Sequence, residues 1–145
     1  MVEGKSPIWK RPMDLMVFSF FLCHIPITIL FAPQVVLPPD MRDVWIPESF
    51  KLILLNSVEL TGDPILAMAI HGRPTWIAWV MAGELLFQLP FFFYACYCLM
   101  KNVDMRMACV VYTTHVLTTM MPVVGQLMSS SGEWKQVIGW QLMYM

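Results

Sequence analysis

Charged side chains are scarce in this chain. Only 13% of its 145 residues are Asp, Glu, Lys or Arg, whereas soluble domains carry about 25%. Hydrophobic residues make up 58% of the chain. This composition is typical of a small integral membrane protein that folds as a single domain over residues 1–145. The net charge of −1 provides no basis for nucleic-acid binding.

The placement of the cysteines argues against disulfides and against a metal site. The four cysteines all fall within apolar segments, where we expect no disulfides: Cys23, Cys96, Cys98 and Cys109. Cys96 and Cys98 are two residues apart, so on a helix they would point to different sides. We therefore expect no metal site, and nothing in the sequence predicts a cofactor.

Long apolar runs are abundant by contrast. About 20 apolar residues suffice to cross a bilayer, and such runs cover about residues 13–31, 75–100 and 107–128. A fourth apolar segment, 133–145, is 13 residues long, which corresponds to about 20 Å of helix. The sequence therefore predicts an all-α, four-helix transmembrane bundle whose fourth helix is short or truncated.

The segment 40–74 between the first two spans is too apolar to be a disordered loop. Its apolar run Phe50–Leu55 is too short to cross a membrane and predicts a short interfacial helix at the mouth of the bundle. Farther along, Asp63 is followed by Pro64, which is the pattern of a helix N-cap and a first helical residue. We expect this second short helix to end near Gly72.

Polar residues interrupt the second span. Glu84 and Gln88 are four residues apart and share one helix face, and Pro90 can kink the helix beside them. A charge near mid-membrane costs at least about 2.5–3.5 kcal/mol, so such residues usually face a partner or a cavity. This face predicts one wall of a polar pocket. The alternative is a protonated Glu84 that bonds to a neighbouring helix.

The third span carries a polar stripe. His115 and Thr119 are four residues apart, with Pro122 three residues farther on the same side. Both side chains are candidates for ligand contact. The alternatives are a packed imidazole for His115 and, for Thr119, a hydroxyl that bonds back to its own helix.

Several motifs together resemble the sigma-2 receptor family, also called transmembrane protein 97, which is part of the EXPERA group. They occur in the family's order along most of the chain: Phe21–Thr28, Asp63–Pro64, Glu84–Phe92 and His115–Pro122. The resemblance implies a four-helix bundle of the endoplasmic reticulum or related membranes, often a homodimer. It also implies a pocket that accepts sterols and cationic amphiphiles, and no established catalytic reaction.

The resemblance further implies which residues bind a ligand. One pocket acid of the family maps to Asp63, and the side chains Glu84, Gln88 and Thr119 match pocket-lining positions. The family's second acid falls at Ala32. This chain therefore lacks the carboxylate that would pair with a ligand amine.

The residues leave three functions open. The first is a non-enzymatic binder of a sterol or another lipid, with a candidate ligand site of Glu84, Gln88, Asp63, Thr119 and His115. The second is a structural accessory subunit of a larger membrane complex, respiratory or photosynthetic for example, with the mitochondrial inner membrane or another organelle membrane as the alternative location. The third is a sterol isomerase, which needs an acid and a base at one face of the ring system; Glu84 and His115 are the candidates.

Overall fold

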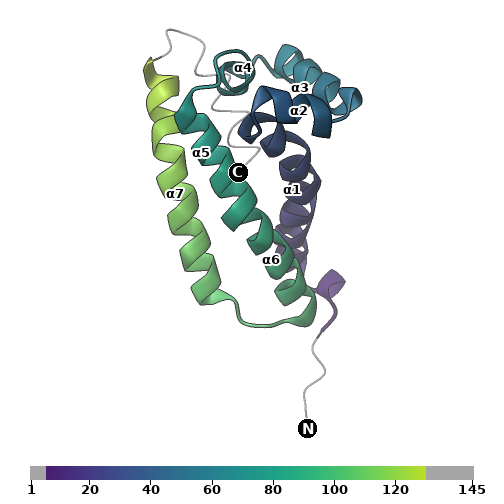
Figure 1. Ribbon diagram of the computed structural model, residues 1–145. Helices are drawn as coiled ribbons and strands as arrows, with labels where there is room; N and C mark the ends of the chain where they lie inside the picture. Colours follow the sequence, from purple (N-terminus) through teal and green to yellow (C-terminus); the bar gives the residue numbers. More distant parts are fainter. Residues whose placement is uncertain (1–5, 130–145) are drawn as a thin grey trace.

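A computed structural model describes residues 6–129 and contains no strand in that range (Figure 1). Three of its helical spans are long and apolar enough to cross a membrane: Pro12–Val36, Thr75–Lys101 and Arg106–Ser129. The prediction of an all-α membrane bundle is thereby confirmed, and its first three spans occur where they were expected. The fourth predicted span, 133–145, lies outside the described residues.

The first span, α1 (Pro12–Val36), continues five residues beyond the predicted end at residue 31. Pro33 had suggested that the helix ends there, because proline removes a backbone donor. Membrane helices nevertheless tolerate a proline, which frees a single carbonyl, for Pro33 that of Ile29. Here Gln34 Nε2 donates to the Leu30 carbonyl at 2.8 Å, and also to the Phe50 carbonyl at 3.1 Å. This side chain therefore supports the last turns of α1 and ties them to the next segment.

Short helices fill the connection between the first two spans, and one was not predicted. This helix, α2 (Pro39–Trp45), starts with a proline at its first position, where the missing N–H has no intrahelical partner to lose. The expected interfacial helix is α3 (Glu48–Thr61), and the expected Asp-Pro helix is α4 (Pro64–His71), which stops at Gly72 as predicted. A 3-10 turn, η1 (Ile8–Lys10), precedes α1.

The second span is broken by a π turn at its polar motif. It consists of α5 (Thr75–Gly83), the π-helical segment η2 (Glu84–Gln88) and α6 (Leu89–Lys101). The Leu89 N–H donates to the Glu84 carbonyl, a bond across five residues rather than four. A proline ring clashes with the carbonyl four residues earlier in a regular α-helix, and the wider turn before Pro90 relieves that clash.

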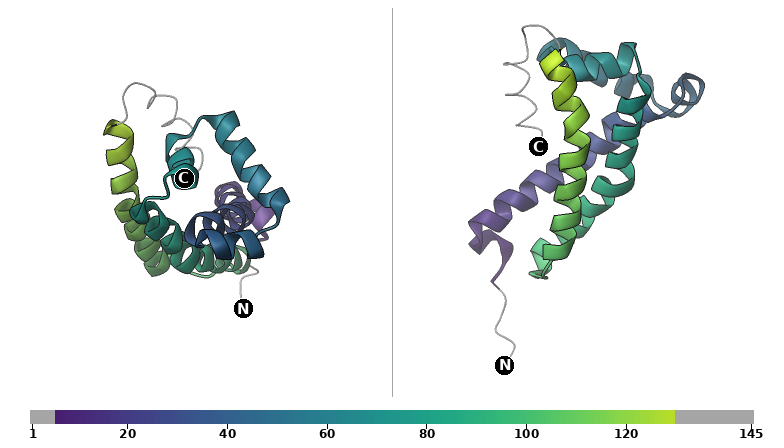
Figure 2. Two further views of the ribbon diagram at one scale, coloured as in Figure 1. Left: turned by 45° about the horizontal axis from the view of Figure 1, so that its top comes forward. Right: turned by 90° about the vertical axis from the view of Figure 1, so that its left-hand side faces the viewer.

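The spans are arranged around α5–α6. The first span, α1, packs along both α5 and α6, whereas α7 (Arg106–Ser129) lies on the other side of them (Figure 1). Seen from the side, α1 is inclined across α7 instead of running parallel to it (Figure 2). The short helices α2, α3 and α4 gather at the end of the bundle where α1 stops and α5 starts (Figure 1).

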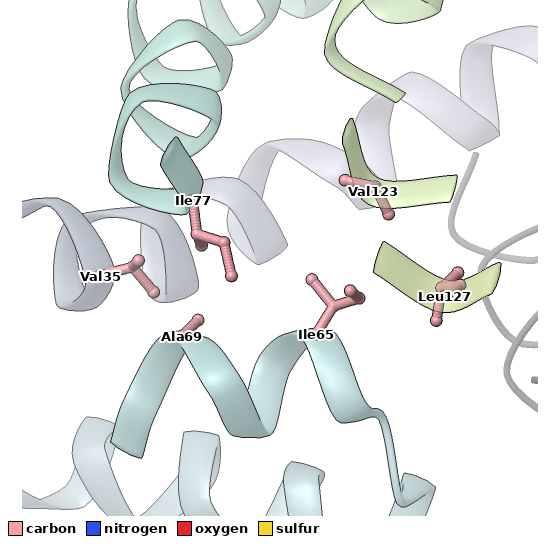
Figure 3. Close-up of a cluster of buried hydrophobic side chains, with 6 residues drawn as sticks. All are labelled: Val35, Ile65, Ala69, Ile77, Val123 and Leu127. Carbon is pink, nitrogen blue, oxygen red and sulfur yellow. The ribbon is translucent and has the colours of Figure 1, made fainter. Parts of the chain in front are cut away.

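Two apolar clusters close the bundle at its two ends. At the end nearest α4, the side chains of that helix meet all three spans (Figure 3), through Val35, Ile65, Ala69, Ile77, Val123 and Leu127. Toward the opposite end, α1 and α6 pack through Phe21, Phe92, Ala95, Cys96 and Leu99. The interior between the two clusters is the part of the bundle that side chains leave partly empty.

Arginine side chains hold the ends of two spans. The Arg73 guanidinium, from the α4–α5 connection, donates to the carbonyls of Gln34 (3.3 Å), Val35 (3.1 Å) and Leu37 at the end of α1. A positive group at a helix C-terminus also favours the helix dipole. Arg73 therefore fixes the entry of the second span to the exit of the first.

Arg11 has the matching role at the other end of the bundle. Its Nη2 donates to the Leu99 carbonyl in the last turns of α6 at 2.5 Å. Its Nη1 pairs with Asp14 at 2.7 Å and bonds Asn102 at 3.2 Å. The start of the first span is thereby attached to the end of the second.

Candidate functional site

A cavity of about 200 Å³ lies between the two apolar clusters. Its walls come from α1, from α5 and η2, and from α7, and residues of α3 and the start of α4 complete it. The lining is largely apolar, with few polar groups. A mostly apolar hollow with a few convergent polar side chains is the usual form of a small-molecule site.

Four of the five predicted site residues line this cavity. Glu84 and Gln88 reach it from the π turn, Thr119 reaches it from α7, and Asp63 reaches it from the start of α4. The structure thus brings together side chains from three parts of the chain. The first, Asp63, and the last, Thr119, are 56 residues apart in the sequence.

His115 does not line the cavity. Its imidazole lies between α7 and the second span, where Nε2 donates to the Gly83 carbonyl at 3.3 Å. The ring also meets the edge of Phe87, with the centroids 5.2 Å apart. His115 therefore packs between two helices, which was the alternative to ligand contact. Of the acid–base pair that an isomerase would need, Glu84 lines the cavity and His115 does not.

Within residues 6–129, the carboxyl of Glu84 makes no hydrogen bond and no ion pair, and it interacts electrostatically with Tyr112. The same part of the structure provides no side-chain hydrogen bond to Gln88. A carboxyl that served only to fasten two helices would need a partner on one of them. Among the described spans, both polar groups instead face the cavity.

Asp63 caps a helix and also lines the cavity. Its Oδ1 accepts from the backbone N–H groups of Ile65 at 2.8 Å and Leu66 at 3.2 Å, so the predicted N-cap is confirmed. The residue is buried, with 8% of its surface exposed, and it also lines the cavity. The cap holds the carboxylate in one orientation at the junction of α3 and α4.

Thr119 bonds to its own helix. Its Oγ1 donates to the Val116 carbonyl at 3.0 Å, and Thr118 does the same to the Thr114 carbonyl at 2.8 Å. This was the alternative predicted for these hydroxyl groups. Because the Thr119 hydroxyl already donates its proton to the helix, Oγ1 can only accept a hydrogen bond from a ligand.

Other polar residues of the cavity were not among the predicted site residues. They are His24, Thr28, Ser57, Thr61 and Tyr112. Helical periodicity could have indicated two of the positions, because Thr28 lies four residues after His24 and Tyr112 lies seven before Thr119. Tyr112 is held by a stacked ring, Phe91, at a centroid distance of 4.3 Å. His24 Nδ1 donates to the Phe20 carbonyl at 2.8 Å.

Comparison with known proteins identifies the family. The family model for EXPERA (EXPanded EBP superfamily) matches residues 40–144. The chain belongs to the EXPERA family. Human sigma intracellular receptor 2 is 31% identical over 121 residues, and the Xenopus tropicalis protein of the same name is 32% identical over 123 residues.

These matches cover most of this EXPERA-family chain and a smaller share of its relatives. The human match includes 82% of the chain and 64% of the human protein, and the Xenopus match includes 83% and 67%. The resemblance to the sigma-2 receptor is therefore confirmed, and the chain spans about two thirds of the length of those relatives. With three apolar spans of sufficient length, it is an integral membrane protein.

One departure from the expected family pattern lies in the cavity wall. Ala32, the position at which the resemblance places a second acid, lines the cavity and is 1% exposed. Its methyl group leaves that wall apolar. Carboxyl groups therefore reach the described cavity only from Glu84 and Asp63.

Proposed function

We propose that this cavity binds a sterol, or another lipid with a single polar end, and that it catalyses no reaction on the ligand. The observation that carries the proposal is the pair Glu84 and Gln88, which face a largely apolar cavity and make no side-chain hydrogen bond with residues 6–129. A sterol has one hydroxyl on an apolar ring system, so one or two polar partners suffice to orient it. The carboxyl and the carboxamide supply them.

The size of the cavity bears on how the ligand lies. Sites for drug-sized ligands are about 300–1,000 Å³, whereas this cavity is about 200 Å³. A sterol would therefore place its hydroxyl end inside and leave part of its apolar body between the spans, in contact with membrane lipid. The family resemblance supports the endoplasmic reticulum as the membrane.

Glu84→Gln tests this proposal. We expect labelling by a photoreactive sterol to fall roughly 3- to 10-fold, which is the effect of weakening one hydrogen bond of ordinary strength. The measurement is the labelling yield of purified protein in detergent, with the folded fraction checked by size-exclusion chromatography. Glu59→Gln is the matched control, because Glu59 is an exposed acid of α3 outside the cavity. Equal labelling of Glu84→Gln and wild type would refute the proposal.

A second function has an observation in its favour. The small cavity and the alanine at position 32 suit a family member that has become an accessory subunit of a larger membrane complex. If so, the protein extracted in mild detergent should migrate on native gels within a complex several times its own 16.7 kDa mass. Migration as a monomer or a small dimer would count against this function and would favour the lipid binder.

A further inference from the structure

The His115 imidazole of the third span lies unusually close to the backbone of the second span beside the candidate site. A Cβ atom added to Gly83 would lie 2.9 Å from His115 Cε1 and 3.1 Å from His115 Nε2. Such distances are too short for ordinary packing. Small residues are what allow membrane helices to approach closely, and here glycine at position 83 lets the imidazole of α7 reach the backbone of the second span.

The imidazole contacts the second span at two points. Its Nε2 donates to the Gly83 carbonyl at 3.3 Å, and its ring meets the edge of Phe87 with centroids 5.2 Å apart. Gly83 immediately precedes the π turn, and Phe87 lies within it. His115 thus contacts the residue just before η2 and one residue within it.

The position of the π turn decides which side chains face the cavity. A π turn accommodates one extra residue, and one residue corresponds to about 100° of rotation in an α-helix. A shift of the turn along the span would therefore rotate Glu84 relative to α6. In a bilayer, backbone groups freed by irregular turns need protein donors or acceptors, and His115 Nε2 is such a donor at the start of η2.

We propose that His115 is a positioning residue: its contacts with Gly83 and Phe87 hold the π turn at Glu84–Gln88, so that both polar side chains face the cavity. His115 acts through the second span, since it does not line the cavity itself. The inference rests on the proposed function, because Glu84 and Gln88 are taken as the ligand groups.

The test replaces the donor while keeping the size of the side chain. His115→Phe keeps a ring beside Phe87 and removes the donor. His115→Gln places an amide nitrogen near the position of Nε2, and His115→Asn places it near Nδ1 instead. The first measurement is deuterium exchange of backbone amides in residues 84–89, compared with residues 92–99 of α6, by mass spectrometry in detergent micelles.

We expect exchange in residues 84–89 to become roughly 3- to 10-fold faster in His115→Phe and His115→Asn, because one hydrogen bond is lost. Residues 92–99 should not change, and His115→Gln should stay within about 2-fold of wild type. Exchange in 84–89 that is the same in all variants would overturn the inference. So would an acceleration that is equal in both segments, because His115 would then stabilise the whole helix pair. If His115→Phe does not fold, the exchange of residues 84–89 is compared between His115→Gln and His115→Asn, and that comparison tests the inference.

The second measurement is photoreactive sterol labelling of the same variants. It should fall in His115→Phe and be restored in His115→Gln. Unchanged labelling in a variant whose π turn exchanges faster would show that the turn does not present ligand groups, which also overturns the inference. Absence of labelling in wild type would refute the proposed function instead, and the exchange data would still test the role of His115 in the turn.

Discussion

Replacing Ala32 by aspartate should create a site for a cationic amphiphile. The side chain lines the cavity and is 1% exposed, so the new carboxylate would face a ligand and not water. Hydrogen bonds that involve a charged group contribute about 1.5–3 kcal/mol. The affinity for an apolar tertiary amine should therefore rise roughly 10- to 100-fold. The measurement is equilibrium binding of a radiolabelled amine to purified protein.

Ala32→Asn is the matched control for this gain. It has the same shape as aspartate but carries no charge, so it should leave the amine affinity within about 3-fold of wild type. Both variants should lower the free energy of unfolding by about 1–3 kcal/mol, because each buries a polar group where a methyl now packs. If Asp and Asn bind the amine equally, the wall formed by Ala32 does not contact the ligand.

Removing Arg73 should have the largest effect on stability. Its guanidinium caps three carbonyls at the end of α1: Gln34, Val35 and Leu37. Partial burial lowers the pKa of Arg73, the charge of Arg42 lowers it further, and the charge of Asp43 opposes both effects. Arg73→Ala should lower the free energy of unfolding by about 2–4 kcal/mol, since it removes charge-assisted hydrogen bonds.

This loss is measured by thermal unfolding in detergent, with tryptophan fluorescence as the readout. Arg73→Lys should recover most of it, because all three contacts are made by Nη2 alone and an ammonium also carries three N–H donors. Arg106→Ala is the contrasting variant: that side chain is 91% exposed and its pair with Asp104 is 3.6 Å long, so its removal should change stability by less than about 0.5 kcal/mol. Equal effects of Arg73→Ala and Arg106→Ala would exclude the capping role.

The cavity itself could be predicted only in part. The four-residue spacing of Glu84 and Gln88, and the cost of a carboxyl in a bilayer, indicated a pocket wall from the sequence. The same type of argument made His115 a candidate for ligand contact, and its imidazole lies between two spans, outside the cavity lining. A polar residue on a span faces either a cavity or a helix contact, and the spacing alone does not distinguish the two.

The residues around Pro90 illustrate the same limit. A kink could be inferred from the proline, because the loss of a backbone donor is a local property. That the kink takes the form of a π turn over Glu84–Gln88, with His115 of α7 against Gly83, is visible only in the folded chain. No sequence pattern in either span predicts that approach.

The Asp63 cap and the apolar spans follow from local chemistry: backbone hydrogen bonds set the helical period, and the bilayer sets the length of an apolar run. The convergence of Asp63, Ala32 and Thr119 on one cavity, and the reach of Arg73 to the end of α1, do not. They depend on how the helices cross and rotate against one another, which interhelical side-chain packing decides. The sequence therefore determines which polar groups lie within the membrane. Only the packing of the helices determines which of these groups lie close together.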